Sequence, residues 1–263
     1  MKISFTNNFF IFWALLRRDL KVLSKQAVST FFDGLSLTVA NIIIFGYLLP
    51  LLGIKPSFVA PVFLGSILTM LFSIASALST RIVFDLRYDR FIDYHLTLPL
   101  SKRWLFAKYI VTFALELILS TGPLLFFSIF VLRFRFSFEH TNWWAFCMVY
   151  LLSILFLSIV FLSFSFSYSY DWFMQNIWPR RIVPLLHLGS LFYPWYAVYA
   201  FSPLIGYCFL ANPITYVAEG LRAALLGAHN FLPAWLCIPL LILFIILAIF
   251  HLAYGIKKQL NPV

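Results

Sequence analysis

The stretch Trp143–Tyr168, WWAFCMVYLLSILFLSIVFLSFSFSY, contains no charged residue and is long enough to cross a membrane as a helix. A crossing helix needs roughly 20 mainly apolar residues, because in lipid its backbone must satisfy its own hydrogen bonds. Other runs of the same character occur along the chain. Together the expected crossings are Val28–Leu51, Phe58–Ile82, Trp104–Leu132, Trp143–Tyr168, Val183–Phe201 and Leu232–Tyr254. We therefore predict an all-α integral membrane protein with six transmembrane helices, of which the fifth is interrupted by prolines.

The composition excludes an ordinary soluble protein. Hydrophobic residues make up 63% of the 263 residues, and charged residues only 11%. A soluble domain carries about 25% charged residues, so this chain has too little polar surface to be one. The three cysteines show no Cys-x-x-Cys spacing, so we expect no bound metal.

The formal net charge of +10 is compatible with a nucleic-acid partner or with an anionic membrane surface. Most lysines and arginines lie in the N-terminal segment, between the second and third expected crossings, before the fifth, and at the C-terminus. The exceptions, on the opposite side, are Lys55, Arg133, Arg135 and Arg222. Because cytoplasmic loops carry the excess of lysine and arginine, we predict a multi-pass protein with both termini in the cytoplasm and no nucleic-acid partner.

The segment Phe9–Lys25 is predicted to be an amphipathic helix on the cytoplasmic surface of the membrane. Its large apolar residues recur at three- and four-residue steps, as on one face of a helix. The cations on the other side are Arg17, Arg18, Lys21 and Lys25. Such a helix buries its apolar face in the headgroup region and leaves its cations to anionic lipids. A plain membrane anchor is the alternative interpretation.

The polar stretch Arg81–Arg103 lies between the second and third expected crossings and, by orientation, faces the cytoplasm. Asp85, Asp89 and Asp93 are four residues apart, which places them on one face of a helix predicted over residues 84–96. An adjacent aromatic face is formed by Phe84, Tyr88 and Phe91. A short amphipathic helix in a cytoplasmic loop is suited to docking a soluble partner, and a solvated connector is the alternative.

The same three aspartates support a hypothesis from another functional class. Carboxylate clusters hold Mg²⁺ on diphosphate substrates, so Asp85, Asp89 and Asp93 would make the chain a Mg²⁺-dependent intramembrane lipid-modifying transferase. Arg87 and Arg90 are interleaved with them, and the sequence contains no second aspartate-rich cluster. Both facts favour the docking interpretation.

Prolines and glycines exclude one straight helix over Pro179–Gly227. Broken helices are expected there, and in a membrane such backbone persists only where protein or water satisfies its polar groups. A new helix is predicted at Asn212-Pro213, with Asn212 as its cap and Pro213 at the first helical position. In that helix Glu219 and Arg222 are three residues apart and close enough to pair.

Glu116 lies inside the third expected crossing. An ionisable group at membrane depth costs roughly 2.5–3.5 kcal/mol and is a functional candidate by default. Glu116 would either line a solute path or form a contact between helices with a nearby serine, threonine or tyrosine.

Two stretches carry a resemblance to a known family. Asn212–Gly227 reads NPITYVAEGLRAALLG, and Tyr88–Leu100 reads YDRFIDYHLTLPL. The first is similar to the Asn-Pro signature and downstream Arg-x-x-Leu-Leu-Gly of the type-2 ABC exporter permeases, and the second resembles the loop before their third span. The resemblance implies one domain over residues 1–263. Its parts would be an interface helix at 9–25, a coupling helix at 84–96 and a re-entrant region at 193–227 before the last span.

By this resemblance the chain would be the permease subunit of an ATP-driven exporter in a bacterial inner membrane. The chain has no Gly-x-x-x-x-Gly-Lys-Ser/Thr phosphate loop. The resemblance therefore implies that it binds no cofactor and that two copies of a cytoplasmic ABC ATPase subunit hold the ATP and Mg²⁺. Six spans form half of such an exporter, which implies a homodimer. The solute would be hydrophobic or amphipathic, drug- or lipid-like, and export of polysaccharide or lipopolysaccharide is the alternative.

The resemblance and the residue patterns together assign candidate sites. The residues expected to couple to the ATPase are Asp85, Tyr88, Asp89, Arg90, Asp93, Arg17 and Arg18. The residues expected to line the solute path or its gate are Glu116, Asn212, Pro213, Glu219 and Arg222.

Overall fold

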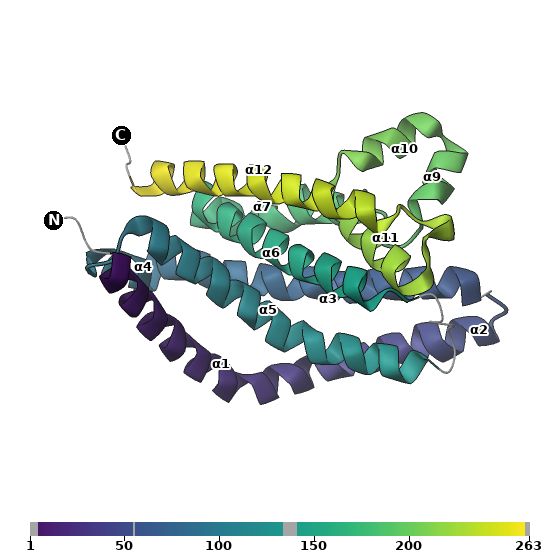
Figure 1. Ribbon diagram of the computed structural model, residues 1–263, viewed down its shortest axis with the longest axis horizontal. Helices are drawn as coiled ribbons and strands as arrows, with labels where there is room; N and C mark the ends of the chain where they lie inside the picture. The colour runs from purple at the N-terminus through teal and green to yellow at the C-terminus, as the bar shows by residue number, and fades with distance from the viewer. Residues whose placement is uncertain (1–4, 55, 134–140, 261–263) are drawn as a thin grey trace.

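Long apolar helices lie side by side along one axis (Figure 1). The computed structural model describes residues 5–54, 56–133 and 141–260. Among these residues, five helices are long and apolar enough to cross a membrane. They are α1 (Phe5–Asn41) with its continuation to Leu51, α3 (Pro56–Phe84), α5 (Lys102–Leu132), α6 (Trp143–Ser167) and α12 (Ala234–Leu260). The predicted helical, multi-pass membrane protein is confirmed, and these helices correspond to the first four expected crossings and the last.

α1 joins two elements that the sequence separates. It continues without a break through the π-helix η1 (Ile42–Leu48) into α2 (Leu49–Leu51). The expected interface helix and first crossing are therefore parts of one helical run, which bends along its course (Figure 1). The helix continues from one part into the other because no glycine or proline, which could end it, occurs between Phe9 and Asp33.

The fifth expected crossing, Val183–Phe201, is not one helix. An unbroken helical run instead begins at Tyr170. Its three pieces are α7 (Tyr170–Ile177), the π-helix η3 (Trp178–Ile182) and α8 (Val183–His187). Pro179 and Pro184 each remove a backbone N–H donor near the start of a piece, which accounts for the departure from regular α-helix. The expected broken helices are present, but the helix that leads into them starts earlier.

Short helices follow at the end of the bundle opposite to the chain termini. They are α9 (Trp195–Phe201), α10 (Pro203–Leu210), α11 (Pro213–Leu226) and the 3-10 turn η4 (Ala228–Asn230). α9 and α10 form a hairpin that projects from the body (Figure 1). The indole nitrogen of Trp195 donates to the carbonyl oxygen of Gly206 at 2.8 Å and joins the two arms. The region expected to be re-entrant is thus a series of short helices.

α6 lies among α3, α5, α11 and α12 and packs against all four. Its sequence is apolar on every side, as expected for a membrane-spanning helix that contacts both protein and lipid. The hydroxyls of Ser79 and Ser165 lie 2.7 Å apart and join α3 to α6. Those of Thr121 and Tyr150 lie 2.9 Å apart and join α5 to α6. Polar contacts of this kind hold membrane helices together, because lipid offers no hydrophobic drive for them to associate.

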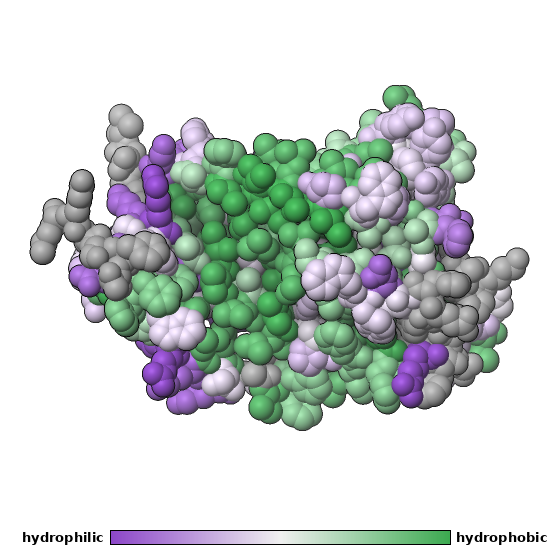
Figure 2. All heavy atoms as spheres, in the orientation of Figure 1, coloured by the Kyte–Doolittle hydropathy of each residue, from purple (hydrophilic) through white to green (hydrophobic). Residues whose placement is uncertain are grey.

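Both chain ends lie on the same side of the bundle. In Figure 1, α1 begins and α12 ends at the same end of the bundle as α4 (Phe91–Thr97), which with η2 (Asp85–Asp89) connects α3 to α5. We call this side the α4 end, and the side that carries α9 and α10 the outer end. Figure 2 shows hydrophilic residues gathered at the two ends and a hydrophobic band between them. Lys2, Lys55 and Arg135, which enter the charge argument, lie outside the described residues.

Candidate functional site

The connection between α3 and α5 turns sharply at the α4 end. Arg90 has a left-handed backbone conformation, with φ 53°, so the helix of α3 and η2 ends there and α4 starts anew. The Asp85 carboxylate caps the new helix. It accepts hydrogen bonds from the backbone N–H groups of Phe91 (3.0 Å) and Ile92 (3.1 Å). The expected single helix over residues 84–96 is therefore two helices with a corner between them.

The expected stacking of Asp85, Asp89 and Asp93 on one helical face is wrong. Asp85 and Asp89 precede the corner, and Asp93 follows it. Both carboxylate oxygens of Asp85 also accept hydrogen bonds from backbone N–H groups of α4. Within the described part of the chain, no group of three His, Cys, Asp or Glu side chains is placed to hold a metal ion. The transferase hypothesis therefore gains no support from the three aspartates.

The outward side of this corner is aromatic and carries charges of both signs, because Arg87 and Arg90 are exposed there as well. Tyr88, Phe91 and Tyr94 are 56%, 60% and 60% exposed. Asp89 and Asp93 are exposed beside them. Large exposed aromatic side chains outside the lipid-facing band are typical of the centre of a protein–protein interface.

Tyr170, the first residue of α7, extends this side. Its ring lies 5.4 Å from that of Tyr88 and 6.3 Å from that of Phe84. We call this group the α4 surface; its members are the exposed Tyr88, Asp89, Phe91, Asp93 and Tyr94 and the half-buried Tyr170. Tyr170 is missed by sequence reasoning because hydropathy does not reveal the start of α7.

A buried polar network behind the α4 surface connects α4 to α1 and α5. The His95 side chain is in the protein interior, with the residue only 4% exposed. Its Nδ1 lies 2.7 Å from the hydroxyl of Tyr109, and its Nε2 lies 3.3 Å from Nη2 of Arg18. Lys108 of α5 forms an ion pair with Asp19 of α1. The N-terminal helix α1 is thereby held to α4 and α5, which lie far from it in the sequence.

The sequence places Arg17 and Arg18 together in the docking region, but only Arg18 reaches this network, and Arg17 is exposed. Sequence reasoning misses His95 and Lys108. One signal points to Lys108, because a lysine inside an apolar run needs a carboxylate partner. Asp19 is the only acidic residue before Asp33.

The His95 environment makes a pH-dependent stability expected. Burial lowers the pKa of His95, the cations Lys108 and Arg18 lower it further, and Asp19 opposes them. Below about pH 6.5 the unfolded chain then binds more protons than the folded one, so folding stability falls as the pH decreases through that value. We expect the thermal transition of the purified chain to decrease between about pH 7.5 and about pH 5.5.

The variant His95→Gln keeps a hydrogen-bonding side chain but cannot titrate, so it should flatten this pH dependence. His229→Gln, at an exposed position at the outer end, is the matched control. A wild-type slope in His95→Gln would show that another group is responsible.

Glu116 pairs with a neighbouring helix. Its carboxylate accepts a hydrogen bond from Nη1 of Arg81 on α3 at 3.0 Å. The Glu116 side chain is 18% exposed and that of Arg81 64%, so the pair lies at the edge of the protein interior. The expected contact between helices exists, but its partner is an arginine. A part for Glu116 in a solute path stays a prediction.

A buried ion pair lies at the outer end. The side chains of Glu219 and Arg222 on α11 are both 0% exposed, and Nη1 of Arg222 donates to Oε1 of Glu219 at 3.0 Å. The predicted pair is confirmed. The charge argument places Arg222 on the side opposite to the termini, and the structure puts it at that end of the bundle, with its side chain inside the protein. Two buried charges are tolerated only when their remaining donors and acceptors are also satisfied.

Arg222 satisfies its other donors with backbone carbonyl oxygens. Its Nε donates to Pro61 of α3 at 3.1 Å. Its terminal nitrogens donate to three carbonyls of the turn after α8, those of Ser190, Leu191 and Tyr193. One guanidinium therefore fastens this turn to α3 and α11.

Glu219 satisfies backbone donors on the other side of the pair. It accepts hydrogen bonds from the N–H of Trp195 at the start of α9 (3.0 Å) and from that of Leu232 before α12 (3.1 Å). Backbone groups at helix ends have no partner within their own helix, and here the two charged side chains supply one. We call Glu219, Arg222 and the backbone groups they bind the outer clamp.

Gly65 of α3 lies directly beside the outer clamp. A Cβ atom at this position would overlap the carbonyl oxygen of Leu191, which accepts a hydrogen bond from Arg222. Because the obstacle is backbone, Gly65→Ala must displace the turn after α8. We expect it to destabilise the folded protein by roughly 2 kcal/mol or more, measured as a lower thermal transition.

Gly122→Ala is the matched control. A Cβ atom at Gly122 meets only the hydroxyl of Tyr150, at 3.5 Å, which is ordinary contact. Alanine in place of a helical glycine stabilises by about 0.5–1 kcal/mol, so this variant should be at least as stable as the wild type. Equal transitions in the two variants would contradict the close approach at Gly65.

Asn212 and Pro213 start α11 as predicted. Oδ1 of Asn212 accepts a hydrogen bond from the N–H of Ile214 at 3.0 Å, and Pro213 is at the first helical position. Nδ2 of Asn212 also donates to the carbonyl oxygen of Leu185 in α8 at 2.8 Å. Asn212 therefore caps one helix and ties it to another, close to the outer clamp.

The candidate residues thus form two separate groups at opposite ends of the bundle, with Glu116 between them. The chain matches the family model described as ABC-2 type transporter over residues 11–226. The matched range runs from α1 to the end of α11 and includes both groups. No curated protein and no solved structure matches the chain. Since the match covers most of the sequence, the chain belongs to the ABC-2 type transporter family, as a membrane-spanning permease subunit that is not itself an ATPase.

Proposed function

We propose that the chain is the permease half of an ATP-driven exporter that moves a hydrophobic or amphipathic solute out of the cytoplasm. Proteins of this family generally work with an ABC ATPase. In this proposal two ATPase subunits supply the ATP and Mg²⁺, and the chain binds no cofactor. The α4 end faces the cytoplasm of a bacterial cell, in its inner membrane. The direction of transport follows from the resemblance to exporter permeases.

One observation carries the coupling to ATP, namely the connection of the α4 surface to the membrane helices. The α4 surface is exposed, but the element beneath it is fixed to α1 and α5 through His95. A partner that pulls on α4 therefore moves both helices, and does not merely deform a loop. Such a rigid connection is what the closure of an ATPase needs to rock the membrane helices between two states.

The packing of the chain supports two copies. The described interior is filled by apolar side chains, and the largest fully buried ones include Phe63, Phe72, Phe146 and Phe161. A closely packed interior leaves no passage for a solute through one chain. The path therefore lies on the surface of the chain and is closed by a second copy.

The charges of the crossing helices support the class of solute. α6 contains no charged residue, and the acid inside α5, Glu116, is paired with Arg81. Lys108 of α5 is paired with Asp19. Crossing helices whose internal charges are neutralised by each other offer little to a strongly charged solute, which favours a hydrophobic or amphipathic one.

Co-purification tests the proposal. The tagged full-length chain should retain an ATPase subunit, and this complex in inside-out vesicles should accumulate a fluorescent amphipathic dye only when ATP and Mg²⁺ are present. The matched control is the complex with an ATPase subunit whose phosphate-loop lysine is replaced. Dye accumulation that is independent of ATP, or Mg²⁺-dependent turnover of lipid by the chain alone, would contradict the proposal.

A further inference from the structure

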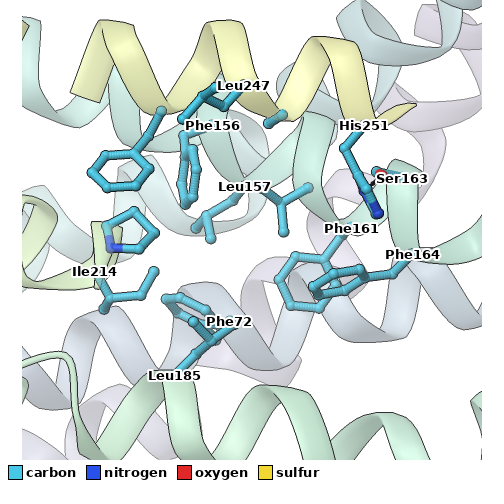
Figure 3. Close-up of a pocket in the computed structure, with 14 residues that line it drawn as sticks. Phe72, Phe156, Leu157, Phe161, Ser163, Phe164, Leu185, Ile214, Leu247 and His251 are labelled. Atoms are coloured by element: carbon cyan, nitrogen blue, oxygen red, sulfur yellow. Dashed lines mark hydrogen bonds between the residues drawn. The ribbon is translucent and has the colours of Figure 1, made fainter. Parts of the chain in front are cut away.

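A cavity of about 270 Å³ lies between α3, α6, α8, α11 and α12 (Figure 3). Its walls are almost entirely apolar and are dominated by phenylalanines. They include Phe72, Phe156, Phe161, Phe164, Leu185 and Ala248. The cavity lies at the depth of the crossing helices, and its lining includes no residue of the α4 surface and neither Glu219 nor Arg222. Of the expected gate residues only Pro213 lines it.

The polar side chains of the lining lie together at one end. His251 of α12 forms a hydrogen bond with Ser163 of α6 through its Nδ1. Figure 3 shows this pair at the opposite end of the cavity from Ile214. Beyond His251, α12 runs on to Lys257 and Lys258 at the α4 end. The cavity therefore has an apolar end inside the membrane and a polar end that points to the aqueous phase.

A third cation lies beside the polar end. Arg181 precedes the lining residue Leu185 by one turn of the same helical run. Its guanidinium lies 5.8 Å from the ring of Tyr168, and that ring lies 6.1 Å from Phe164 in the wall of the cavity. Arg181 is exposed, and among the described residues no carboxylate is within ion-pair distance of it. Arg181 lies just before the fifth expected crossing, Val183–Phe201, at the depth where a cation between helices can meet an anionic lipid head group.

The size of the cavity limits its occupant. An engineered apolar cavity of about 150 Å³ binds benzene, and drug-sized ligands occupy about 300–1,000 Å³. At about 270 Å³ this cavity is too small for a drug-sized molecule and large enough for part of one hydrocarbon chain. Water is a poor occupant, because apart from Ser163 and His251 the lining offers no polar side chain.

We propose that the cavity binds one acyl chain of an anionic phospholipid, whose phosphate lies at Arg181 with His251 at the neck of the site. The apolar walls hold the chain, the guanidinium neutralises the phosphate, and Lys257 and Lys258 add positive charge at the same end. The occupant is a resident lipid of the leaflet at the α4 end, not the transported solute. Binding of this lipid is therefore independent of the proposed transport, and a test of one does not decide the other.

Photolabelling in nanodiscs tests the site. The full-length chain is placed in nanodiscs of phosphatidylglycerol and phosphatidylcholine, with a phosphatidylglycerol probe that carries a diazirine in one acyl chain. Mass spectrometry should locate the label on α6 and α12 around the cavity. Unlabelled phosphatidylglycerol should compete better than phosphatidylcholine, and equal competition would overturn the assignment of an anionic head group.

Two pairs of variants separate the cavity from general contact with lipid. Ala248→Phe fills the cavity and should reduce labelling about tenfold, because the chain loses its space. Ala253→Phe makes the same change at an exposed position of α12 and should label as the wild type does. Arg181→Gln should abolish the preference for phosphatidylglycerol, and Arg180→Gln, at the adjacent exposed residue, should keep it.

Equal labelling of Ala248→Phe and Ala253→Phe would overturn the proposal, as would labelled peptides that lie outside the cavity walls. Val160→Phe is a second filling variant in case Ala248→Phe does not yield monodisperse protein, because Val160 lines the same cavity from α6. It should lose labelling in the same way.

Discussion

Replacing Arg222 by methionine should destabilise the folded protein by about 3–5 kcal/mol, the usual effect of removing one partner of a buried ion pair. Glu219 would stay in the interior without its cation, since both side chains are 0% exposed. The carbonyl oxygen of Pro61 and those of the turn after α8 would lose their donor as well. Methionine fills similar space, so the loss would report on charge and hydrogen bonding more than on volume.

The measurement is the thermal transition of the purified protein, together with the fraction that elutes as a single species. Arg103→Met is the matched control, because Arg103 is exposed near the start of α5. The double variant Glu219→Gln with Arg222→Met should recover part of the loss, since no buried charge is then left over. A transition for Arg222→Met equal to that of Arg103→Met would show that the outer clamp does not hold this end together.

The local contacts at the outer end could be predicted from the sequence. The cap at Asn212 and the pair of Glu219 with Arg222 follow from rules about residues two to four apart on a helix, and both are confirmed. The other partners of Arg222 come from Pro61 and from the turn after α8. No spacing rule reaches across so many residues, because those contacts depend on how the helices pack.

The α4 end shows where periodicity fails. A four-residue spacing stacks aspartates only while the helix continues, and Arg90 ends it in a left-handed conformation. Arginine is not a residue that marks such a turn, so the sequence carries no signal for the corner. The start of α7 is hidden for another reason, since Arg180 and Arg181 lower the hydropathy of the run that contains it.

Charge reversal at the α4 surface should release the ATPase subunit and abolish ATP-dependent transport. In the double variant with Asp89→Arg and Asp93→Arg, the ATPase subunit should bind at least about tenfold more weakly, because like charges opposed across an interface cost several kcal/mol. Both residues are exposed, so the fold itself should change little. The readouts are ATPase retained on the tagged chain and ATP-dependent dye accumulation in vesicles.

The three aspartates of this segment serve as controls for one another, because they have different roles in the structure. Asp85→Ala removes the cap of α4 and should lower the thermal transition, as loss of a helix cap costs about 0.5–2 kcal/mol. The double arginine variant should keep the wild-type transition and lose the ATPase. If that variant instead transported fully, the partner would have to bind elsewhere, and the network at His95 would then serve only to hold α1, α4 and α5 together.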